Sequence, residues 1–202
     1  MCSASGAGGV RAGHRPLITF AVRWWPPVGL AAMALLGWAV GKGSTAVDDW
    51  FQLANGLGRL LFFTDQRTMA VLLVGLLALA VYRRRWPLVA AVTVSPVAAI
   101  WLSRFLKTVF GRQKGGGLAY PSGHTTLMVV VLGMVLLVMG AQLYVVMVAV
   151  VWALLGMLGQ AVTYHYFTDA VGGLLLGSAI ACLAAALVGG TGRSPRRHPR
   201  FP

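Results

Sequence analysis

The sequence predicts an all-α integral membrane protein, a bundle of six transmembrane helices, and composition and charge spacing carry this prediction. Of its 202 residues, 58% are hydrophobic and only 10% are charged, which lies outside the range of ordinary soluble domains. Uncharged stretches follow one another along the chain, and the longest has 54 residues between Lys114 and Asp169. Because a helix needs about 20 apolar residues to cross a bilayer, that stretch predicts two spans and a turn.

Uncharged, apolar segments bounded by charges or turn signals mark the expected spans. They lie at about 25–41, 67–83, 86–106, 122–139, 142–161 and 169–190. The sequence MGAQ at 139–142 is the expected turn between the fourth and fifth spans. Between the first and second spans, apolar residues recur at helical spacing over 48–63, which predicts an amphipathic helix on the outer surface.

The net charge of +13 indicates membrane topology here, because the basic residues do not cluster on a soluble, nucleic-acid-binding face. Of the 17 Lys and Arg residues, three precede the first span, three separate the second from the third, and four lie in the tail. With six crossings these ten share one side, which the positive-inside tendency makes cytoplasmic. We expect a multi-pass plasma-membrane protein with both termini in the cytoplasm, divided into a basic segment, a membrane domain and a basic tail at 1–24, 25–190 and 191–202.

The loop between the third and fourth spans, LKTVFGRQKGGGLAYPSGH, is typical of an anion site. Proline suits the first turn of a helix, and the small residues after it leave backbone N–H groups open to phosphate. His124 would stand beside such an anion, able to donate a proton; an interfacial helix start with a hydrogen-bonding histidine is the alternative. Lys107, Arg112 and Lys114 precede this helix end, and with three glycines at 115–117 they fit a phosphate-binding loop better than solvated charges.

The segment TYHYFTDAVGG, between the fifth and sixth spans, falls on the same non-cytoplasmic face. His165 and Asp169 are four residues apart, so on one helix the carboxylate can accept the imidazole N–H. That bond would leave the other ring nitrogen as a base or nucleophile. The alternative is that Asp169 only stabilises its helix, because a negative charge in the first turn interacts favourably with the positive end of the helix dipole.

Lys107, Arg112, PSGH at 121–124 and the H-x-x-x-D pair resemble the signatures of the type-2 phosphatidic acid phosphatase superfamily, over about residues 45–190. This superfamily includes lipid phosphate phosphatases and undecaprenyl pyrophosphate phosphatases. The resemblance implies hydrolysis, without metal or cofactor, of a lipid phosphate or pyrophosphate of the polyprenyl, phosphatidic acid or phosphatidylglycerophosphate type. The active site would open at the non-cytoplasmic face of the membrane.

The resemblance also assigns roles to individual residues. His165 would attack phosphorus and form a phosphohistidine, Asp169 would orient it, and His124 would protonate the leaving group. The residues expected to bind phosphate are Lys107, Arg112, Lys114, Ser122 and Gly123.

Two departures from the family pattern leave another function open. Lys114 and Gly115 stand where the first signature ends in Arg-Pro, and Leu158 and Gly159 stand where the third opens with Ser-Arg. Because a charged contact to a transition state strongly affects the rate, the missing arginine makes an impaired member the alternative, one that binds or moves phospholipid or polyprenyl phosphate. Arg112 or Arg104 could replace the arginine. A small transporter with a His–Asp proton relay is a third possibility.

Overall fold

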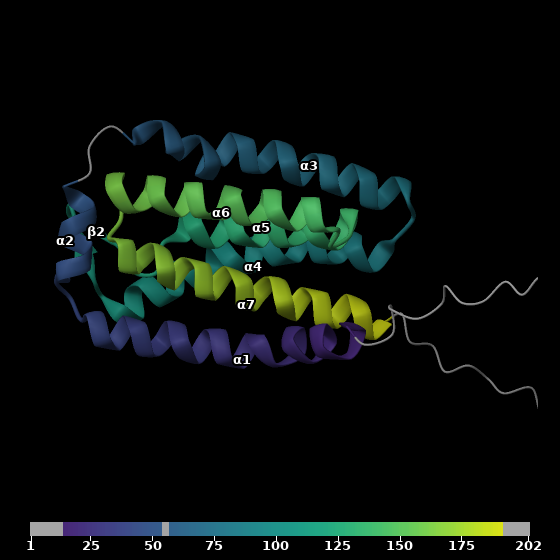
Figure 1. The fold of residues 1–202 in the computed structure, drawn as a ribbon, viewed down its shortest axis with the longest axis horizontal. Helices are drawn as coiled ribbons and strands as arrows, with labels where there is room; N and C mark the ends of the chain where they lie inside the picture. Colours follow the sequence, from purple (N-terminus) through teal and green to yellow (C-terminus); the bar gives the residue numbers. More distant parts are fainter. Residues whose placement is uncertain (1–13, 54–56, 192–202) are drawn as a thin grey trace, which may run out of the picture.

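The computed structural model describes residues 14–53 and 57–191, which form a bundle of long helices (Figure 1). The helices are α1 His14–Val40, α2 Ala46–Gln52, the 3₁₀ helix η1 Gly58–Thr64, α3 Gln66–Tyr82, α4 Trp86–Phe110, α5 Gly123–Met139, α6 Leu143–Thr163 and α7 Phe167–Thr191. Two short antiparallel strands, β1 Gln113–Lys114 and β2 Gly117–Leu118, form a hairpin between α4 and α5. The all-helical class is therefore confirmed, apart from this hairpin.

Four segments of the described chain are long and apolar enough to cross a membrane: Gly58–Tyr82, Trp86–Phe110, Leu143–Thr163 and Phe167–Gly189. The fourth predicted span, α5, is apolar but has only 17 residues. The first predicted span lies in α1, which begins at His14, earlier than expected, and contains Pro26 and Pro27. Helices thus occupy all six predicted places, whereas six membrane crossings remain a prediction.

The amphipathic helix predicted over 48–63 is wrong as a single element. The α2 helix ends at Gln52, and η1 begins only at Gly58. Gly58 has low helix propensity, so the sequence gives little local support to one continuous helix over this range. The apolar residues of the two pieces pack separately instead: Phe51 stacks on Phe167 with ring centroids 4.2 Å apart, and η1 lies against α6.

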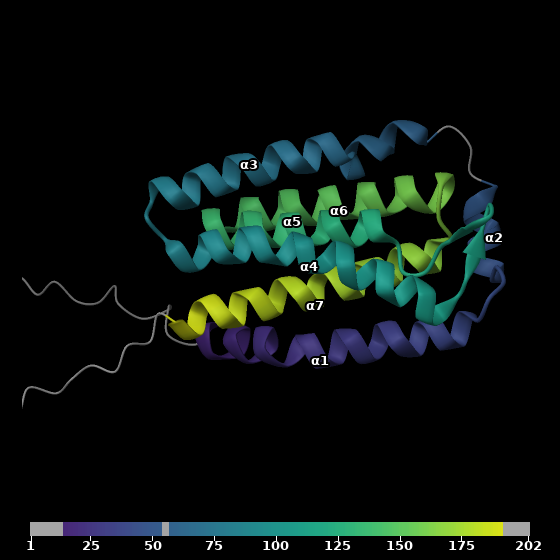
Figure 2. The same ribbon diagram turned by 180° about the vertical axis from the view of Figure 1, so that it is seen from behind.

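The central helix of the bundle is α5, which contacts α3, α4, α6 and α7 (Figures 1 and 2). Glycines on α7 let it approach α5 closely, since a Cβ on Gly173 would lie 2.6 Å from the Ser122 carbonyl oxygen. A Cβ on Gly177 would similarly lie 2.7 Å from the Thr126 carbonyl oxygen. This contact brings the start of α5 beside the start of α7, although the two are more than 40 residues apart in sequence.

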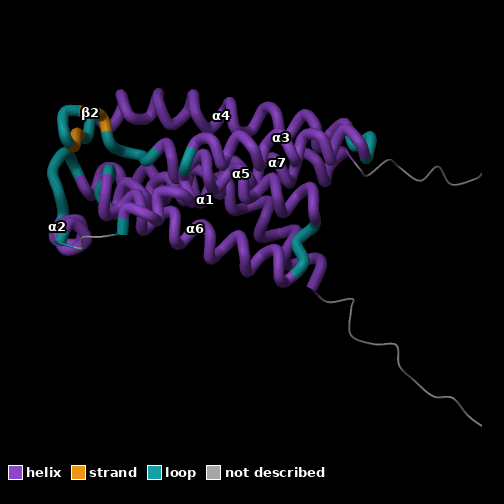
Figure 3. The backbone as a smooth tube through the Cα atoms, turned by 90° about the horizontal axis from the view of Figure 1, so that it is seen from above, coloured by secondary structure: helices purple, strands orange, loops and turns teal. Residues whose placement is uncertain are grey.

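Tyr120 fixes the chain just before α5. Its side chain is completely buried, and its hydroxyl donates a hydrogen bond to the Met33 carbonyl of α1. The ring fits between helices only because Gly37 and Gly172 lack side chains; a Cβ on either would lie within 2.6 Å of a ring carbon. The α4–α5 connection is thereby attached to both α1 and α7, and the hairpin and α2 gather at this end of the bundle (Figure 3).

Candidate active site

The PSGH segment forms the start of α5, as its composition predicts. Ser122 is the N-cap, and its Oγ accepts a hydrogen bond from the Thr125 N–H at 3.4 Å. The Ser122 backbone N–H donates to the Asp169 carbonyl oxygen at 2.9 Å, which links the start of α5 to the first turn of α7. The structure therefore brings together the two polar segments that the sequence places on one face.

His124 and His165 lie near one another, with ring centroids 6.4 Å apart. His124 is exposed, whereas His165 is only 8% exposed. The rings come from different elements, α5 and the turn between α6 and α7, so their proximity depends on the close packing of α5 on α7. Two imidazoles at this separation could act on opposite sides of one small anion.

Asp169 is adjacent to His165 but is not hydrogen-bonded to it. The His165 Nδ1 and Asp169 Oδ2 atoms are 3.8 Å apart, and a shortening of roughly 1 Å would make the predicted bond. Within the described residues, Nδ1 is buried and has no hydrogen-bond partner. Catalytic hydrogen bonds often tighten only when substrate binds, so this geometry is compatible with Asp169 as the orienting carboxylate.

Arg112 lies inside the protein, and its guanidinium nitrogens are used by neighbouring protein groups. It is 1% exposed, with Nη1 2.8 Å from Asp169 Oδ1 and Nη2 2.7 Å from Asp48 Oδ2. Nε and Nη2 also donate to the Gly43 carbonyl at 3.1 and 2.8 Å. This arrangement favours a role for Arg112 in holding Asp169, in place of the direct phosphate contact that the sequence suggests.

Asp48 is a member of this cluster that the sequence analysis missed. It is fully buried in α2, and its Oδ1 accepts hydrogen bonds from the backbone N–H and the Oγ1 of Thr168, each at 2.9 Å. Burial opposes its charge, but the hydrogen bonds from Thr168, Thr45 and Arg112 outweigh burial and hold the pKa of Asp48 below its ordinary value. A sequence signal exists in T-x-x-D at 45–48, a capping box that the structure confirms.

Two lysines, Lys107 in the last turn of α4 and Lys114 in β1, contact the backbone around the site. Lys107 Nζ donates to the Leu118 carbonyl at 2.9 Å, and Lys114 Nζ donates to the His165 carbonyl at 2.8 Å. Lys114 also lies 4.8 Å from the centre of the Tyr166 ring, a cation–π contact. Burial lowers the pKa of Lys114, although Asp169 and Asp48 oppose the shift. Lys114 thus fastens the hairpin over the turn that carries His165.

A pocket of about 210 Å³ opens beside His124, between α4, α5 and the η1–α3 segment. Its polar lining combines Arg104 and Lys107 of α4 with His124 and with Gly123, the first residue of α5. Two cations facing a helix N-terminus make a suitable site for an anionic group. Of the predicted site residues this pocket includes Lys107, Gly123 and His124, and it adds Arg104; His165 lies beside it but outside its lining.

An apolar groove adjoins this polar pocket. It has a volume of about 340 Å³, lies along α3 and α4, and shares Gln66, Ile100 and Leu127 with the polar pocket. The rest of its lining is apolar except for Thr93: Met69, Ala70, Leu73, Val74, Leu77, Val92, Pro96 and Val97. The two cavities together suit a molecule with an anionic head and a hydrocarbon chain.

Gly159, where the resemblance would place an arginine, packs against η1. A Cβ on Gly159 would lie 2.8 Å from the Leu60 backbone carbon, so η1 covers this face of α6. The next residue, Gln160, donates through Nε2 to the Thr64 hydroxyl at 2.7 Å, and Thr64 lines the polar pocket. Leu60 and its neighbours therefore occupy the space that an arginine at 159 would need.

We expect Gly159→Arg to destabilise the protein, because the side chain would have to displace the η1 backbone. Overpacking of this kind costs about 1–3 kcal/mol or more. Thermal unfolding of the detergent-purified variant would measure the loss, with Gly159→Ala as a smaller change of the same kind. A Gly159→Arg variant that unfolds at the wild-type temperature would contradict this expectation and show that η1 yields to the larger side chain.

No group of three or more His, Cys, Asp or Glu side chains suited to a metal ion occurs within residues 14–53 and 57–191. No family model, no curated protein and no solved structure matches the chain. The case for a function therefore depends on the residues and the geometry of this site.

Proposed function

We propose that the protein is a six-span membrane phosphatase of the type-2 phosphatidic acid phosphatase kind, which hydrolyses a lipid phosphate or pyrophosphate. The observation that carries the proposal is the polar pocket with Arg104, Lys107 and His124, which continues into an apolar groove between α3 and α4. A free, water-soluble phosphate ester would use the first cavity and leave the second unexplained. A lipid phosphate uses both, with its head beside His124 and its chain along α3.

In the proposed reaction the phosphoryl group lies between His124 and His165. His165 attacks phosphorus through Nε2, since Nδ1 is the nitrogen nearer to Asp169. A nitrogen–phosphorus bond forms as the bond from phosphorus to the leaving oxygen breaks, and His124 transfers a proton to that oxygen. Water then attacks the phosphohistidine, which releases inorganic phosphate and restores His165.

Charge in the transition state would be balanced by Arg104 and Lys107. Both lie on one face of α4, three residues apart, and both line the polar pocket. Arg104 therefore takes the place of the arginine missing at 159 more readily than Arg112, whose nitrogens already bind Asp48, Asp169, Thr168 and Gly43. In this scheme Arg112 and Asp48 position Asp169, which in turn orients His165.

Purified protein should release phosphate from lipid phosphates without added metal and in the presence of chelator. Arg104→Gln and Lys107→Gln should each lower kcat and kcat/KM together by on the order of 10²-fold, because each removes a charge that acts on the developing oxyanion. Arg67→Gln, an exposed α3 residue outside the pocket lining, is the matched control and should retain normal rates.

The alternative is a protein that binds or moves such lipids without turnover, and the absent arginine together with the 3.8 Å separation of His165 and Asp169 favours it. Saturable binding of a lipid phosphate with no phosphate release above that of the His165→Ala variant would establish this alternative in place of the phosphatase.

The proposed topology has both termini in the cytoplasm and the pocket at the non-cytoplasmic face. With Cys2 and Cys182 replaced, a cysteine at position 8 or 195, both outside the described residues, should resist a membrane-impermeant thiol reagent in intact cells. A cysteine at the exposed hairpin residue Gly116 should react, although its positive φ of 81° makes a folding check necessary. The reverse labelling pattern would overturn the topology.

A further inference from the structure

We propose that the protein carries a second lipid site, for an anionic phospholipid, at the end of the bundle opposite the candidate active site. One acyl chain of this lipid would lie in the groove between α4 and α7, and its phosphate would contact Arg84 and Arg85 in the α3–α4 turn.

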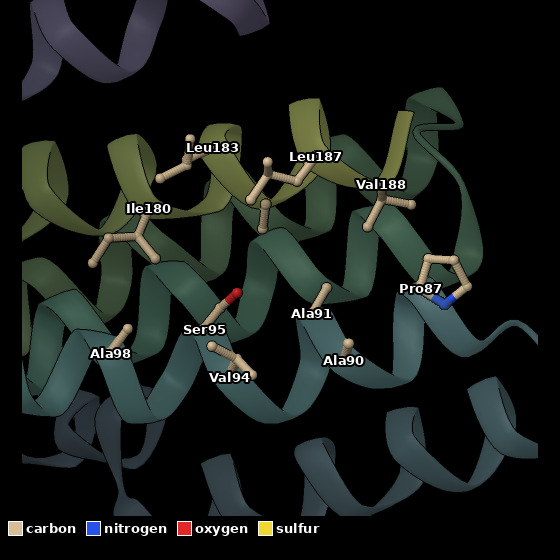
Figure 4. Close-up of a pocket in the computed structure, with 11 residues that line it drawn as sticks. Pro87, Ala90, Ala91, Val94, Ser95, Ala98, Ile180, Leu183, Leu187 and Val188 are labelled. Carbon is tan, nitrogen blue, oxygen red and sulfur yellow. The ribbon is translucent and has the colours of Figure 1, made fainter. Parts of the chain in front are cut away.

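The groove is an apolar hollow of about 360 Å³ between two helices that are long enough to cross a membrane (Figure 4). From α4 it is lined by Pro87, Ala90, Ala91, Val94, Ser95 and Ala98, and from α7 by Ile180, Leu183, Ala184, Leu187 and Val188. Small residues on α4 face larger aliphatic ones on α7, which leaves room for a chain between the helices. Such a surface within a bilayer accepts hydrocarbon and excludes a polar ligand.

The length of the groove matches one leaflet of a membrane. From Pro87 to Ala98 the α4 helix rises about 16 Å at 1.5 Å per residue, close to half of a hydrocarbon core about 30 Å thick. At this end of the bundle two aromatic side chains, Tyr82 at the end of α3 and Trp86 at the start of α4, are 85% and 66% exposed. Exposed Tyr and Trp are typical of the level of lipid headgroups, so the groove begins where an acyl chain leaves its headgroup.

The positive charge at this end of the groove favours an anionic ligand. Arg84 and Arg85 are exposed, and neither guanidinium makes a hydrogen bond or ion pair within the described residues, whereas Arg83 donates to the Val138 carbonyl at 3.0 Å. The four acidic residues of the sequence, Asp48, Asp49, Asp65 and Asp169, all lie at or near the other ends of these helices. Arg84 also has a φ of 53°, a left-handed conformation that costs an arginine backbone energy relative to glycine.

This site is separate from the one that would bind substrate. Pro87 and Lys107 are 20 residues apart on the same helix, which corresponds to about 30 Å along its axis. A lipid seated at Pro87 therefore belongs to the opposite leaflet from a lipid whose head lies beside His124. The basic end is also the end that the charge distribution makes cytoplasmic, where anionic lipids are recruited by basic residues.

Native mass spectrometry of the delipidated protein, titrated with phosphatidylglycerol or phosphatidylcholine of the same acyl chains, tests the proposal. We expect tighter binding of phosphatidylglycerol, and an affinity about 25-fold weaker in the Arg84→Gln/Arg85→Gln variant, at about fivefold for each arginine. Lys42→Gln/Arg59→Gln, which removes two exposed charges near the other end, should leave the affinity unchanged. Because the two arginines lie in an exposed turn, unchanged melting of the variant would confirm its fold.

A second variant tests the groove itself. Ala90→Phe should fill the hollow and weaken phosphatidylglycerol binding, whereas Val151→Phe, at a half-exposed position on α6 outside the groove, should not. Equal affinity for the charged and the neutral lipid, or equal loss in the control variants, would overturn the proposal. These measurements do not involve phosphate release, so their result is independent of the proposed enzymatic function.

Discussion

Replacing His165 with alanine is expected to lower the rate of phosphate release by roughly 10⁴-fold or more, while the protein stays folded. A nucleophile that forms the covalent intermediate has no substitute in the site, because positioning alone does not break the phosphorus–oxygen bond. His165 is mostly buried yet makes no side-chain hydrogen bond in the described structure, so alanine removes little structural support. Phosphate release from a lipid phosphate and thermal unfolding should be measured on the same preparation.

His124→Ala is the informative comparison for this variant. Because His124 is the proposed proton donor, the His124→Ala variant should release phosphate about 10²–10⁴-fold more slowly than the wild type. The loss should be smaller for a substrate whose leaving group is already acidic. Reactions with ³²P-labelled substrate, quenched with detergent at alkaline pH, should trap a base-stable, acid-labile phosphoenzyme in the wild type and none in His165→Ala. If His165→Ala kept near-normal turnover, the covalent mechanism would be wrong even if the protein proved to be a phosphatase.

Replacing Arg112 with alanine is expected to destabilise the fold by about 3–5 kcal/mol, the cost of breaking a buried ion pair. Arg112 lies between two carboxylates that are fully buried, those of Asp48 and Asp169, and alanine would leave both without their cation. Thermal or denaturant unfolding in detergent should show the loss. Arg59→Ala, an exposed arginine in η1, should change stability by no more than about 0.5 kcal/mol.

Further variants separate structural support from a direct contact with phosphate. Arg112→Lys keeps the positive charge but lacks the planar guanidinium group that can bind two carboxylates at once. Its stability should therefore lie between those of Arg112→Ala and the wild type. Asp48→Asn should also destabilise the protein at neutral pH; because the pKa of Asp48 is depressed in the folded state, its contribution is lost as the pH falls through that lowered value. A stable Arg112→Ala variant with reduced kcat would contradict the structural role and return Arg112 to the phosphate site.

The positions of the long helices, and the start of α5 within the candidate site, could be predicted from the sequence, because local rules determine them. Apolar runs between charges mark the helices, and the turn at 139–142 separates α5 from α6 as expected. Ser122 caps α5 because a proline, a serine and a glycine before an apolar run favour a helix start. The spacing of His165 and Asp169 predicts their proximity on one helix; their Nδ1 and Oδ2 atoms do lie 3.8 Å apart, although His165 lies in the turn before α7, which begins at Phe167.

The partner of each charged group could be identified only from the tertiary structure. Arg112 and Lys114 belong to the same basic loop in sequence, yet Arg112 pairs with Asp48, 64 residues away, and Lys114 bonds to the His165 backbone. Arg104, by contrast, lines the polar pocket because α4 turns that face toward the start of α5. The sequence determines where charges occur along each helix, whereas the close packing of glycine-bearing helices decides which charges are buried together and which remain open to a ligand.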